Sequence, residues 1–412
     1  MFQSVLGLVA LTGLAWLLSE NRRKVRLRTI VAGIGLQVAV AFIFLKVPLF
    51  EKAFLALNGL VLALDAATTE GTTFVFGYLG GGPLPFTESF PGQAFILAFK
   101  SLPLILVVGA LSSLLFYWGV IPFIVRMISK FLQKTMDIGG ALGVGVSVNI
   151  FVGMVEAPLF VKPYLERMTR SELFTLMTTG LATIAGTMLV IYAAILKPVI
   201  PNSLGQILVA SIISVPAAIM IAKIMIPETG DKTEGDVASP NDASGAMDAV
   251  VKGGQDGLAV LLNVAAMLIV LIALVSLINQ ILAFIPYQHS APVTLQRIVG
   301  IVMRPFVWLI GVPWSEASTA GALMGVKTIL NEFIAYDMMS KLSPDVLSER
   351  SRMIMTYAMC GFANPGSLGI MVGGMGVMAP SRRPEIVSLG IRSVIAGTMA
   401  TLMTGAVVGL MY

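Results

Sequence analysis

Long apolar segments, separated by short polar or basic ones, follow one another along most of the chain. They cover residues 2–18, 30–47, 94–125, 173–196, 206–226, 258–285 and 387–410. An apolar stretch of about 18 residues is long enough to cross a bilayer as a helix, whereas the strands of a membrane barrel give short alternating segments. The pattern therefore predicts an all-α polytopic membrane protein.

Three stretches need separate interpretation. Residues 94–125 exceed what a bilayer requires, so we expect one helix there that tilts or projects beyond the membrane. Residues 2–18 lack a basic start and end in a charge cluster, so we expect a retained span and not a cleaved signal. Residues 54–64 predict an interfacial helix, and the Gly, Pro and Thr rich chain after them predicts an external loop.

A carboxylate interrupts the apolar sequence NIFVGMVEAPLF at residues 149–160. Glu156 lies between Gly153 and Pro158, which both disfavour a continuous helix. A charge at mid-bilayer costs about 2.5 to 3.5 kcal/mol, and broken backbone survives at that depth only inside protein or beside a wet cavity. We therefore expect Glu156 to face a cavity from a re-entrant hairpin at residues 139–165.

The second half of the chain repeats this arrangement. Residues 180–186 have the sequence GLATIAG and residues 361–367 have GFANPGS, each inside an apolar span. Glu156 lies 24 residues before the first of these, and Glu332, in GVKTILNEFIAY, lies 29 residues before the second. Paired interrupted segments in two halves are the best sequence indication of a transporter binding site. We predict inverted repeats with two re-entrant hairpins and two broken helices.

Basic residues set the predicted orientation. The densest basic cluster, residues 22–28, follows the first span, so the positive-inside rule makes it cytoplasmic and puts the N-terminus outside. Counting spans from there places the first hairpin on the cytoplasmic side and the second outside. We predict four parts. Residues 1–92 hold the first spans and the interfacial and external segment, and residues 93–226 hold a scaffold span, the first hairpin, the first broken helix and the following span. Residues 227–257 form a polar linker with an amphipathic lead-in, and residues 258–412 hold a second scaffold span, the second hairpin, the second broken helix and the last span.

Composition narrows the functional classes. Hydrophobic residues make up 57% of the 412 residues and charged residues only 12%, against about a quarter charged in a soluble domain. The net charge of +5 does not indicate nucleic acid, because the basic residues lie at the ends of apolar segments. One cysteine, Cys360, permits no intrachain disulfide. The single histidine, His289, leaves no His base for a Ser or Cys nucleophile, so the sequence predicts neither an enzyme nor a cofactor.

The unwound segments supply polar groups for a solute and for a small cation. Backbone carbonyls, together with Asn149 and Thr183, can replace the hydration shell of a hard group-I cation. The groups that can exchange hydrogen bonds with a polar, neutral solute are Glu156, Glu332, Asn364 and Ser367. The alternative is that small and hydroxyl residues only hold membrane helices together. That alternative explains a single Thr or Ser better than it explains a repeated pair of buried acids.

Over nearly its whole length the chain resembles the concentrative nucleoside transporter family. The sequences that carry the resemblance are VEAPL (155–159), RSELF (170–174), GLATIAG, PWSEASTAGALMGVKTILNEFIAY (313–336) and GFANPGSLGI (361–370). The resemblance implies a homotrimer of eight-span protomers in the inner membrane, each with an outer scaffold and a mobile transport domain. Its partners would be membrane lipid and a nucleoside, which the transport domain moves inward with sodium or protons.

The resemblance also implies roles for single residues. The sodium site would combine the side chains of Asn149 and Thr183 with the backbone carbonyls of Val152 and Ile184. The ribose would be bound by Glu332, Asn364 and Ser367, with Phe362 beside the ligand and Glu156 facing the base. The retained Asn149 and Thr183 favour sodium, while two membrane carboxylates leave proton coupling open.

One departure from the family pattern concerns the base. Where the bacterial motif is Gly-Gln-Thr-Glu-Ala-Pro-Leu, this chain has Met154 and Val155 in place of Gln and Thr, and their side chains cannot hydrogen-bond. Pro365 and Met188 are expected to reshape the same pocket. The solute is therefore a nucleoside or, alternatively, another ribosylated or polar molecule. A passive channel is a third possibility, but it would require a continuous polar lining.

Overall fold

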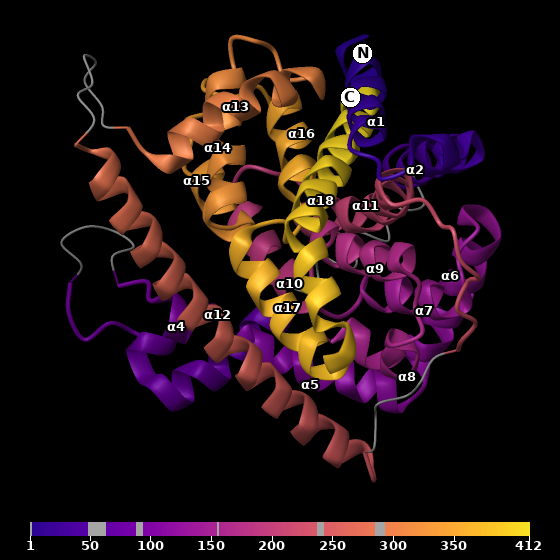
Figure 1. The fold of residues 1–412 in the computed structure, drawn as a ribbon. Helices are drawn as coiled ribbons and strands as arrows, with labels where there is room; N and C mark the ends of the chain where they lie inside the picture. The colour runs from indigo at the N-terminus through magenta and orange to yellow at the C-terminus, as the bar shows by residue number, and fades with distance from the viewer. Residues whose placement is uncertain (1, 48–62, 88–93, 155, 237–242, 285–292) are drawn as a thin grey trace.

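The computed structural model describes residues 2–47, 63–87, 94–154, 156–236, 243–284 and 293–412, and the described chain is all-helical (Figure 1). The longer unbroken helices are α1 (Phe2–Leu17), α2 (Leu27–Lys46), α5 (Leu104–Tyr117), α6 (Val120–Met136), α11 (Ser203–Met225), α12 (Ala246–Leu282), α13 (Leu295–Leu309) and α18 (Arg383–Met411). The hairpins and broken helices contain α7 (Gly140–Val148), η3 (Ala157–Val161), α8 (Lys162–Leu165), α9 (Arg170–Ala182), α10 (Gly186–Leu196), α14 (Ala317–Ile329), α15 (Glu332–Ser340), α16 (Glu349–Met359) and α17 (Pro365–Met378). Short turns of helix connect them at η1 (Arg22–Lys24), η2 (Gly77–Gly80), α4 (Leu97–Lys100) and η4 (Pro380–Arg382). The predicted interfacial helix at residues 54–64 falls largely outside the described residues. The external loop predicted after it is wrong in its first part, because the chain is helical over residues 63–76.

Apolar side chains cover the outside of the bundle as well as its core. α11 and α18 are largely buried, whereas only a small share of α2, α5 and α12 is buried. Val31 of α2 is 64% exposed and Ile269 of α12 is 71% exposed. In the part of the chain that the structure describes, five helices are long and apolar enough to cross a membrane. An exterior this apolar suits lipid contact, which confirms the predicted all-α polytopic class.

The prediction of one helix over residues 94–125 is wrong, because the chain turns at Gly119. This glycine has a left-handed φ of +76°, so α5 ends just before it and α6 begins just after it as a separate helix. α6 is amphipathic, and the large apolar residues on its exposed face include Phe123, Met127 and Phe131. A helix with one apolar face exposed suits the plane of the membrane surface better than a crossing.

α12 is a single helix of 37 residues that runs obliquely along one side of the molecule (Figure 1). The predicted amphipathic lead-in before residue 258 is therefore the first part of this helix. Glycines let α12 lie against α5: a Cβ built on Gly253 would be 2.5 Å from the carbonyl oxygen of Gly109, and one built on Gly257 would be 2.8 Å from the Cα of Leu106. Such close approach of membrane helices requires small residues.

The two hairpins lie at opposite ends of α18. Arg382, just before α18, donates a 2.8 Å hydrogen bond to the carbonyl oxygen of Met168, at the outer end of the first hairpin. Arg350 donates to the carbonyl oxygens of Gly311, ahead of the second hairpin, and of Gly409, near the far end of α18. A helix of 29 residues is about 43 Å long. The hairpins therefore enter the bundle from opposite sides, as predicted for inverted repeats.

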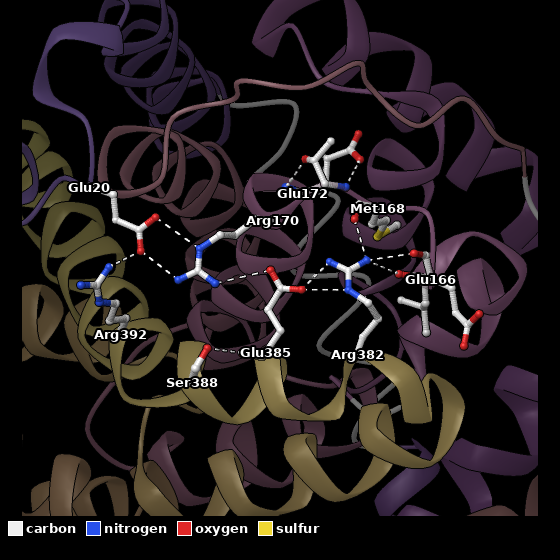
Figure 2. Close-up of polar contacts among 11 residues, drawn as sticks. Glu20, Glu166, Met168, Arg170, Glu172, Arg382, Glu385, Ser388 and Arg392 are labelled. Carbon is white, nitrogen blue, oxygen red and sulfur yellow. Dashed lines mark hydrogen bonds and ion pairs between the residues drawn. The ribbon is translucent and has the colours of Figure 1, made fainter.

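An exposed ion-pair network, which we call the end network, surrounds the first of these ends (Figure 2). Arg170, at the start of α9, pairs with Glu20 (2.9 Å) and with Glu385 of α18 (3.4 Å). Glu385 also pairs with Arg382 at 2.6 Å, and Glu20 pairs with Arg392. The end network therefore joins the chain after α1, the start of α9 and the start of α18.

Candidate functional site

The turn of the first hairpin holds its acid against the backbone. α7 ends at its C-cap Asn149, and Glu156 directly precedes η3, which has Pro158 in its first turn. The amide of Ala157 donates to the carbonyl oxygen of Gly153 at 2.9 Å. The Glu156 carboxylate lies so close over Gly153 that a side chain at that position would collide with it. A larger residue at position 153 would therefore require the flexible end of the Glu156 side chain to move.

The first broken helix is unwound between α9 and α10, as the GLATIAG sequence predicts. The hairpin turn is bound to this break, because the amide of Gly186 donates to the carbonyl oxygen of Phe151 at 3.2 Å. Asn149 is buried, and its Nδ2 donates to the carbonyl oxygen of Thr179 (3.1 Å) and to the hydroxyl of Thr183. The hydroxyl of Thr183 donates in turn to the same carbonyl at 2.9 Å. The two side chains predicted to hold a cation are therefore in direct contact.

The two predicted backbone ligands belong to the same two segments. Val152 lies in the hairpin turn, and Ile184 lies in the break, with its amide 3.5 Å from the hydroxyl of Ser211. Asn149, Thr183 and Ile184 are each at most 2% exposed. Neutral amide, hydroxyl and carbonyl groups enclosed in protein are a donor set that fits a hard monovalent cation.

The second broken helix is unwound between α16 and α17 and meets the first one. The amide of Phe362 donates to the carbonyl oxygen of Thr183 at 3.3 Å. Asn364 caps α17, because its Oδ1 accepts from the amide of Ser367 at 2.8 Å. Pro365 is the first residue of α17, a position where the missing N–H costs nothing. The two breaks therefore touch at the centre of the bundle.

Glu332 is the first residue of α15 and lies buried, 3% exposed, at the tip of the second hairpin. Asn331 caps this helix by accepting from the amide of Ile334 at 2.9 Å. The carboxylate of Glu332 accepts a 2.6 Å hydrogen bond from the hydroxyl of Tyr192 in α10 and a 3.3 Å bond from Nδ2 of Asn364. Such donors offset the cost of burying an ionised carboxylate.

Two members of this network, Tyr192 and Lys327, were not predicted. Lys327 of α14 is fully buried, and its Nζ donates to the carbonyl oxygen of Ala363 in the second break at 3.3 Å. A lysine five residues before an acid in a membrane-buried segment was a usable signal, because a buried cation requires a nearby anion. Tyr192 gave no comparable signal, since a tyrosine inside an apolar run is compatible with many positions.

Both hairpin tips and both helix breaks border one cavity of about 190 Å³. Its polar lining residues include Glu156, Asn263, Asn331, Glu332, Asn364 and Ser367, and its apolar lining residues include Met154, Met188, Phe362 and Leu271. Each predicted solute-binding residue that the structure describes therefore borders the same cavity. Val155 lies outside the described residues. Pro365, expected to reshape the pocket, is exposed and does not line the cavity.

A second cavity of about 360 Å³ adjoins the first at Gly153, Glu156 and Val260. It lies between the first hairpin, α5 and α12, and its polar lining includes Ser112, Lys252 and Asp256. Glu156, at the turn of the first hairpin, therefore borders both cavities.

Comparisons with known proteins agree with this arrangement. Family models described as "Na+ dependent nucleoside transporter N-terminus" and "C-terminus" match residues 6–79 and 206–409, and one described as "Nucleoside recognition" matches residues 98–199. An uncharacterized transporter of Haemophilus influenzae is 39% identical, with 99% of this chain and 97% of that protein covered. The nucleoside permease NupC of Helicobacter pylori is 33% identical, with 99% and 97% covered.

The likeness extends to solved structures. CNTnw in an inward-facing substrate-bound state has a TM-score of 0.89 and 36% sequence identity, and the match covers 99% of this chain and 97% of that one. The match therefore includes the hairpins, the broken helices and the cavity between them.

Proposed function

Because this chain belongs to the Na⁺-dependent nucleoside transporter family, and is thus a transporter and not an enzyme, we propose that it takes up nucleosides by cation-coupled alternating access. The observation that carries the proposal is the single cavity at which both hairpin tips and both helix breaks meet. Opposed hairpins around discontinuous helices are the arrangement with which transporters expose one site to either side in turn.

The end of the cavity at Glu332 suits a ribose. Tyr192 and Asn364 each donate to a different oxygen of the Glu332 carboxylate. Each carboxylate oxygen can accept a further hydrogen bond, so the fixed carboxylate can bind neighbouring sugar hydroxyls. A solute without those hydroxyls would leave buried polar groups unpaired, which is how such a site discriminates.

The end of the cavity at the first hairpin suits a base with few polar requirements. Met154 and Phe362 line it together with Glu156. An aromatic ring can stack on any base, whereas a methionine side chain offers packing without a donor. We therefore expect the transporter to select strongly for the sugar and weakly among bases. Another ribosylated or polar solute is the alternative that this apolar lining favours.

Sodium is the coupling ion that the donor set supports. Asn149 and Thr183, with the carbonyls of Val152 and Ile184, would hold it, the Asn149 amide presenting its oxygen after a half-turn. Bound there, the cation would supply a positive charge between the hairpin turn and the first break. The amide of Phe362 donates to the Thr183 carbonyl. A cation that fixes the position of Thr183 would therefore also fix Phe362, which lines the solute cavity.

α5 and α12 are the natural fixed part of the molecule. They pack along each other through glycines, and α12 supplies one wall of the cavity, including Asn263 and Leu271. We propose that the hairpins and broken helices move against this pair as the transport domain. We also expect a homotrimer in the inner membrane, with the first hairpin on the cytoplasmic side.

Uptake measured with and without sodium tests the coupling. In transport-deficient cells that express the protein, uptake of labelled uridine should be saturable, and replacing sodium by choline at constant pH should reduce it to background. Thr183→Ala should raise the sodium concentration for half-maximal uptake at least tenfold. Thr178→Ala is the matched control, because its hydroxyl is buried in α9, just before the break, and has no hydrogen-bond partner among the described residues. Uptake that follows a proton gradient and ignores sodium would contradict the choice of ion.

Competition by unlabelled solutes tests the substrate. Ribonucleosides with different bases should compete within about tenfold of one another, whereas 2′,3′-dideoxynucleosides should compete poorly. Glu332→Ala should abolish uptake, and normal transport by that variant would show that the site is wrongly assigned. Met154→Gln combined with Val155→Thr should restore preference among bases, and an unchanged substrate profile would contradict the role given to this turn.

A further inference from the structure

A basic cavity lies between the end of α6 and the end of α11 and shares no lining residue with the solute cavity. Its volume is about 480 Å³. The cationic residues that line it come from three parts of the chain and are Arg23, Lys24, Arg26, Lys223 and Lys232. The acidic lining residues are Asp137 and Glu228. Five cations facing two carboxylates leave the cavity with a surplus of positive charge.

The two carboxylates are already engaged by the protein. Asp137 pairs with Arg26 at 3.2 Å and with Lys232. The pKa of Asp137 lies below its usual value, mainly because Lys232 donates to its carboxylate, so Asp137 is ionised at neutral pH and is counted in the surplus. Glu228 accepts hydrogen bonds from the hydroxyl of Thr169 (2.7 Å) and from backbone amides. Both acids are therefore held by partners within the protein.

Arg23 and Lys24 are the cations with donors to spare. Within the described residues their side chains make no hydrogen bond or ion pair, and both are exposed at the rim of the cavity. Lys223 is engaged differently, since its Nζ donates to the backbone carbonyls of Met136 (3.1 Å) and Asp137 (2.7 Å). An anion at the rim would therefore meet Arg23 and Lys24 first.

Apolar residues around the cavity place it at the level of the lipid headgroups. Leu27, next to Arg26, is 73% exposed, and Val31 one turn further along α2 is 64% exposed. On the other side of the cavity, α6 exposes Phe131 close to its end. Trp16, before the basic loop, has the guanidinium of Arg22 5.5 Å from its ring centroid, and tryptophan is typical of the membrane surface. The positive charge thus adjoins lipid-facing surface on two sides.

We propose that this cavity binds the phosphate headgroup of an anionic phospholipid. Basic pockets between membrane helices at the bilayer surface have the chemistry that such headgroups require, and hydrogen bonds from Arg and Lys to phosphate are charge-assisted. The phosphate lies against Arg23 and Lys24, and the acyl chains lie along α2 at Leu27 and Val31. The bound lipid joins the loop after α1 to α11 and the linker, a role separate from solute transport.

Thermal unfolding of the full-length protein in neutral detergent tests this site. The unfolding temperature is measured while phosphatidylglycerol, phosphatidylcholine or inorganic phosphate is added. We expect phosphatidylglycerol to raise it saturably and the other two to have no such effect. Removing a cation that contacts the bound headgroup weakens anionic-lipid binding about fivefold. The double variant Arg23→Gln/Lys24→Gln should therefore need at least tenfold more phosphatidylglycerol.

The matched control removes two exposed cations of α6 that do not line the cavity, in Lys130→Gln/Lys134→Gln. It should change the half-effect concentration by less than about twofold. Equal effects of phosphatidylglycerol and phosphatidylcholine would overturn the proposal, as would a control pair as damaging as the cavity pair. If inorganic phosphate reproduces the whole effect, the ligand is a soluble anion and the assignment to lipid is wrong. The single variant Lys24→Gln, expected to weaken binding about fivefold, keeps the test decisive if the double variant expresses poorly.

Discussion

The charged groups around the solute cavity and those of the end network are of similar chemical types, yet they differ in their surroundings. Lys327 is fully buried and Glu332 is 3% exposed, whereas the side chains of Arg170 and Glu20 are 42% and 31% exposed. The buried groups have a few directed hydrogen bonds, two at Glu332 and one from Lys327, while the exposed groups form several ion pairs around one another (Figure 2).

The difference shows which charges are costly to disturb. Burying an ionised group costs several kcal/mol unless its partners are well placed, so removing a partner of Glu332 or Lys327 should cost more than removing an exposed charge. Exposed ion pairs contribute about 0.2 to 1 kcal/mol each and are screened by salt. The end network joins the outer end of the first hairpin to α18 but contributes little to the free energy of unfolding. Substitutions in the end network should therefore destabilise the protein less than substitutions of the buried charges.

The largest effect is expected from Lys327→Met. This change removes one of two opposite charges that are both buried, Lys327 and Glu332, and removing one of two such charges costs about 3 to 5 kcal/mol. Thermal unfolding of the purified protein measures the loss. Adding Glu332→Gln should recover part of that stability while uptake stays absent.

Lys341→Met is the control for that substitution. Lys341 follows the second hairpin and pairs with Asp337 at 2.6 Å, but its side chain is 72% exposed. The change should lower stability by under about 1 kcal/mol. If Lys341→Met and Lys327→Met destabilise the protein equally, the contrast between buried and exposed charge fails.

Tyr192→Phe should have the next largest effect and should act on function more than on folding. It removes the 2.6 Å hydrogen bond to Glu332, and a hydrogen bond to a charged group is worth about 1.5 to 3 kcal/mol. We expect the KM for uridine uptake to rise about tenfold or more. Tyr336→Phe is the matched control, because that buried hydroxyl donates to the carbonyl oxygen of Thr356 and not to the cavity. A KM that rises equally in both variants would contradict the positioning role of Tyr192.

The sequence predicted the parts of this site that interrupt an apolar pattern. Gly153, Pro158, GLATIAG and GFANPGS marked the hairpin turn and the two breaks, because Gly, Pro and Asn disfavour a continuous helix wherever they occur. The contact between Asn149 and Thr183 and the shared cavity of Glu156 and Glu332 followed from pairing those interruptions. The roles given to these residues in binding sodium and solute stay predictions.

The sequence did not predict features that depend on where a side chain or a backbone segment points in the folded protein. Lys252 and Asp256 looked like part of a polar lead-in, yet they lie within α12 and line the second cavity. A polar residue inside a helix gives no sign of whether it faces a loop, a cavity or a neighbour until the packing is known. The end of α5 depended likewise on the backbone of Gly119, since many glycines in membrane helices interrupt nothing.

Arg170→Gln should have a smaller effect than any change at the cavity. It removes two exposed ion pairs, to Glu20 and Glu385, and we expect a loss of about 1 kcal/mol at low ionic strength. In 1 M salt the difference from the parent protein should nearly vanish, because charges are then screened within about 3 Å. Lys197→Gln, an exposed lysine outside the end network, should show neither the loss nor its salt dependence. Uptake should be unchanged in both variants, and a lost uptake in Arg170→Gln would assign the end network a part in transport.

Glu20→Gln is expected to have the smallest effect, and its pH dependence identifies the cause. The pKa of Glu20 lies below its usual value of 4.5, chiefly because Arg170 donates to the carboxylate. The pKa of Glu20 is lower in the folded state than in the unfolded state, so the pairing contributes its full stabilisation at pH values above the unfolded-state pKa. That stabilisation is lost as the pH falls through the folded-state pKa. The stability difference between parent and variant, under about 1 kcal/mol, should therefore be full at pH 7 and shrink below about pH 4.5. In the Arg170→Gln background, most of this pH dependence should disappear. If the stability difference between the parent protein and Glu20→Gln stays constant with pH, Glu20 contributes by packing and not by its charge.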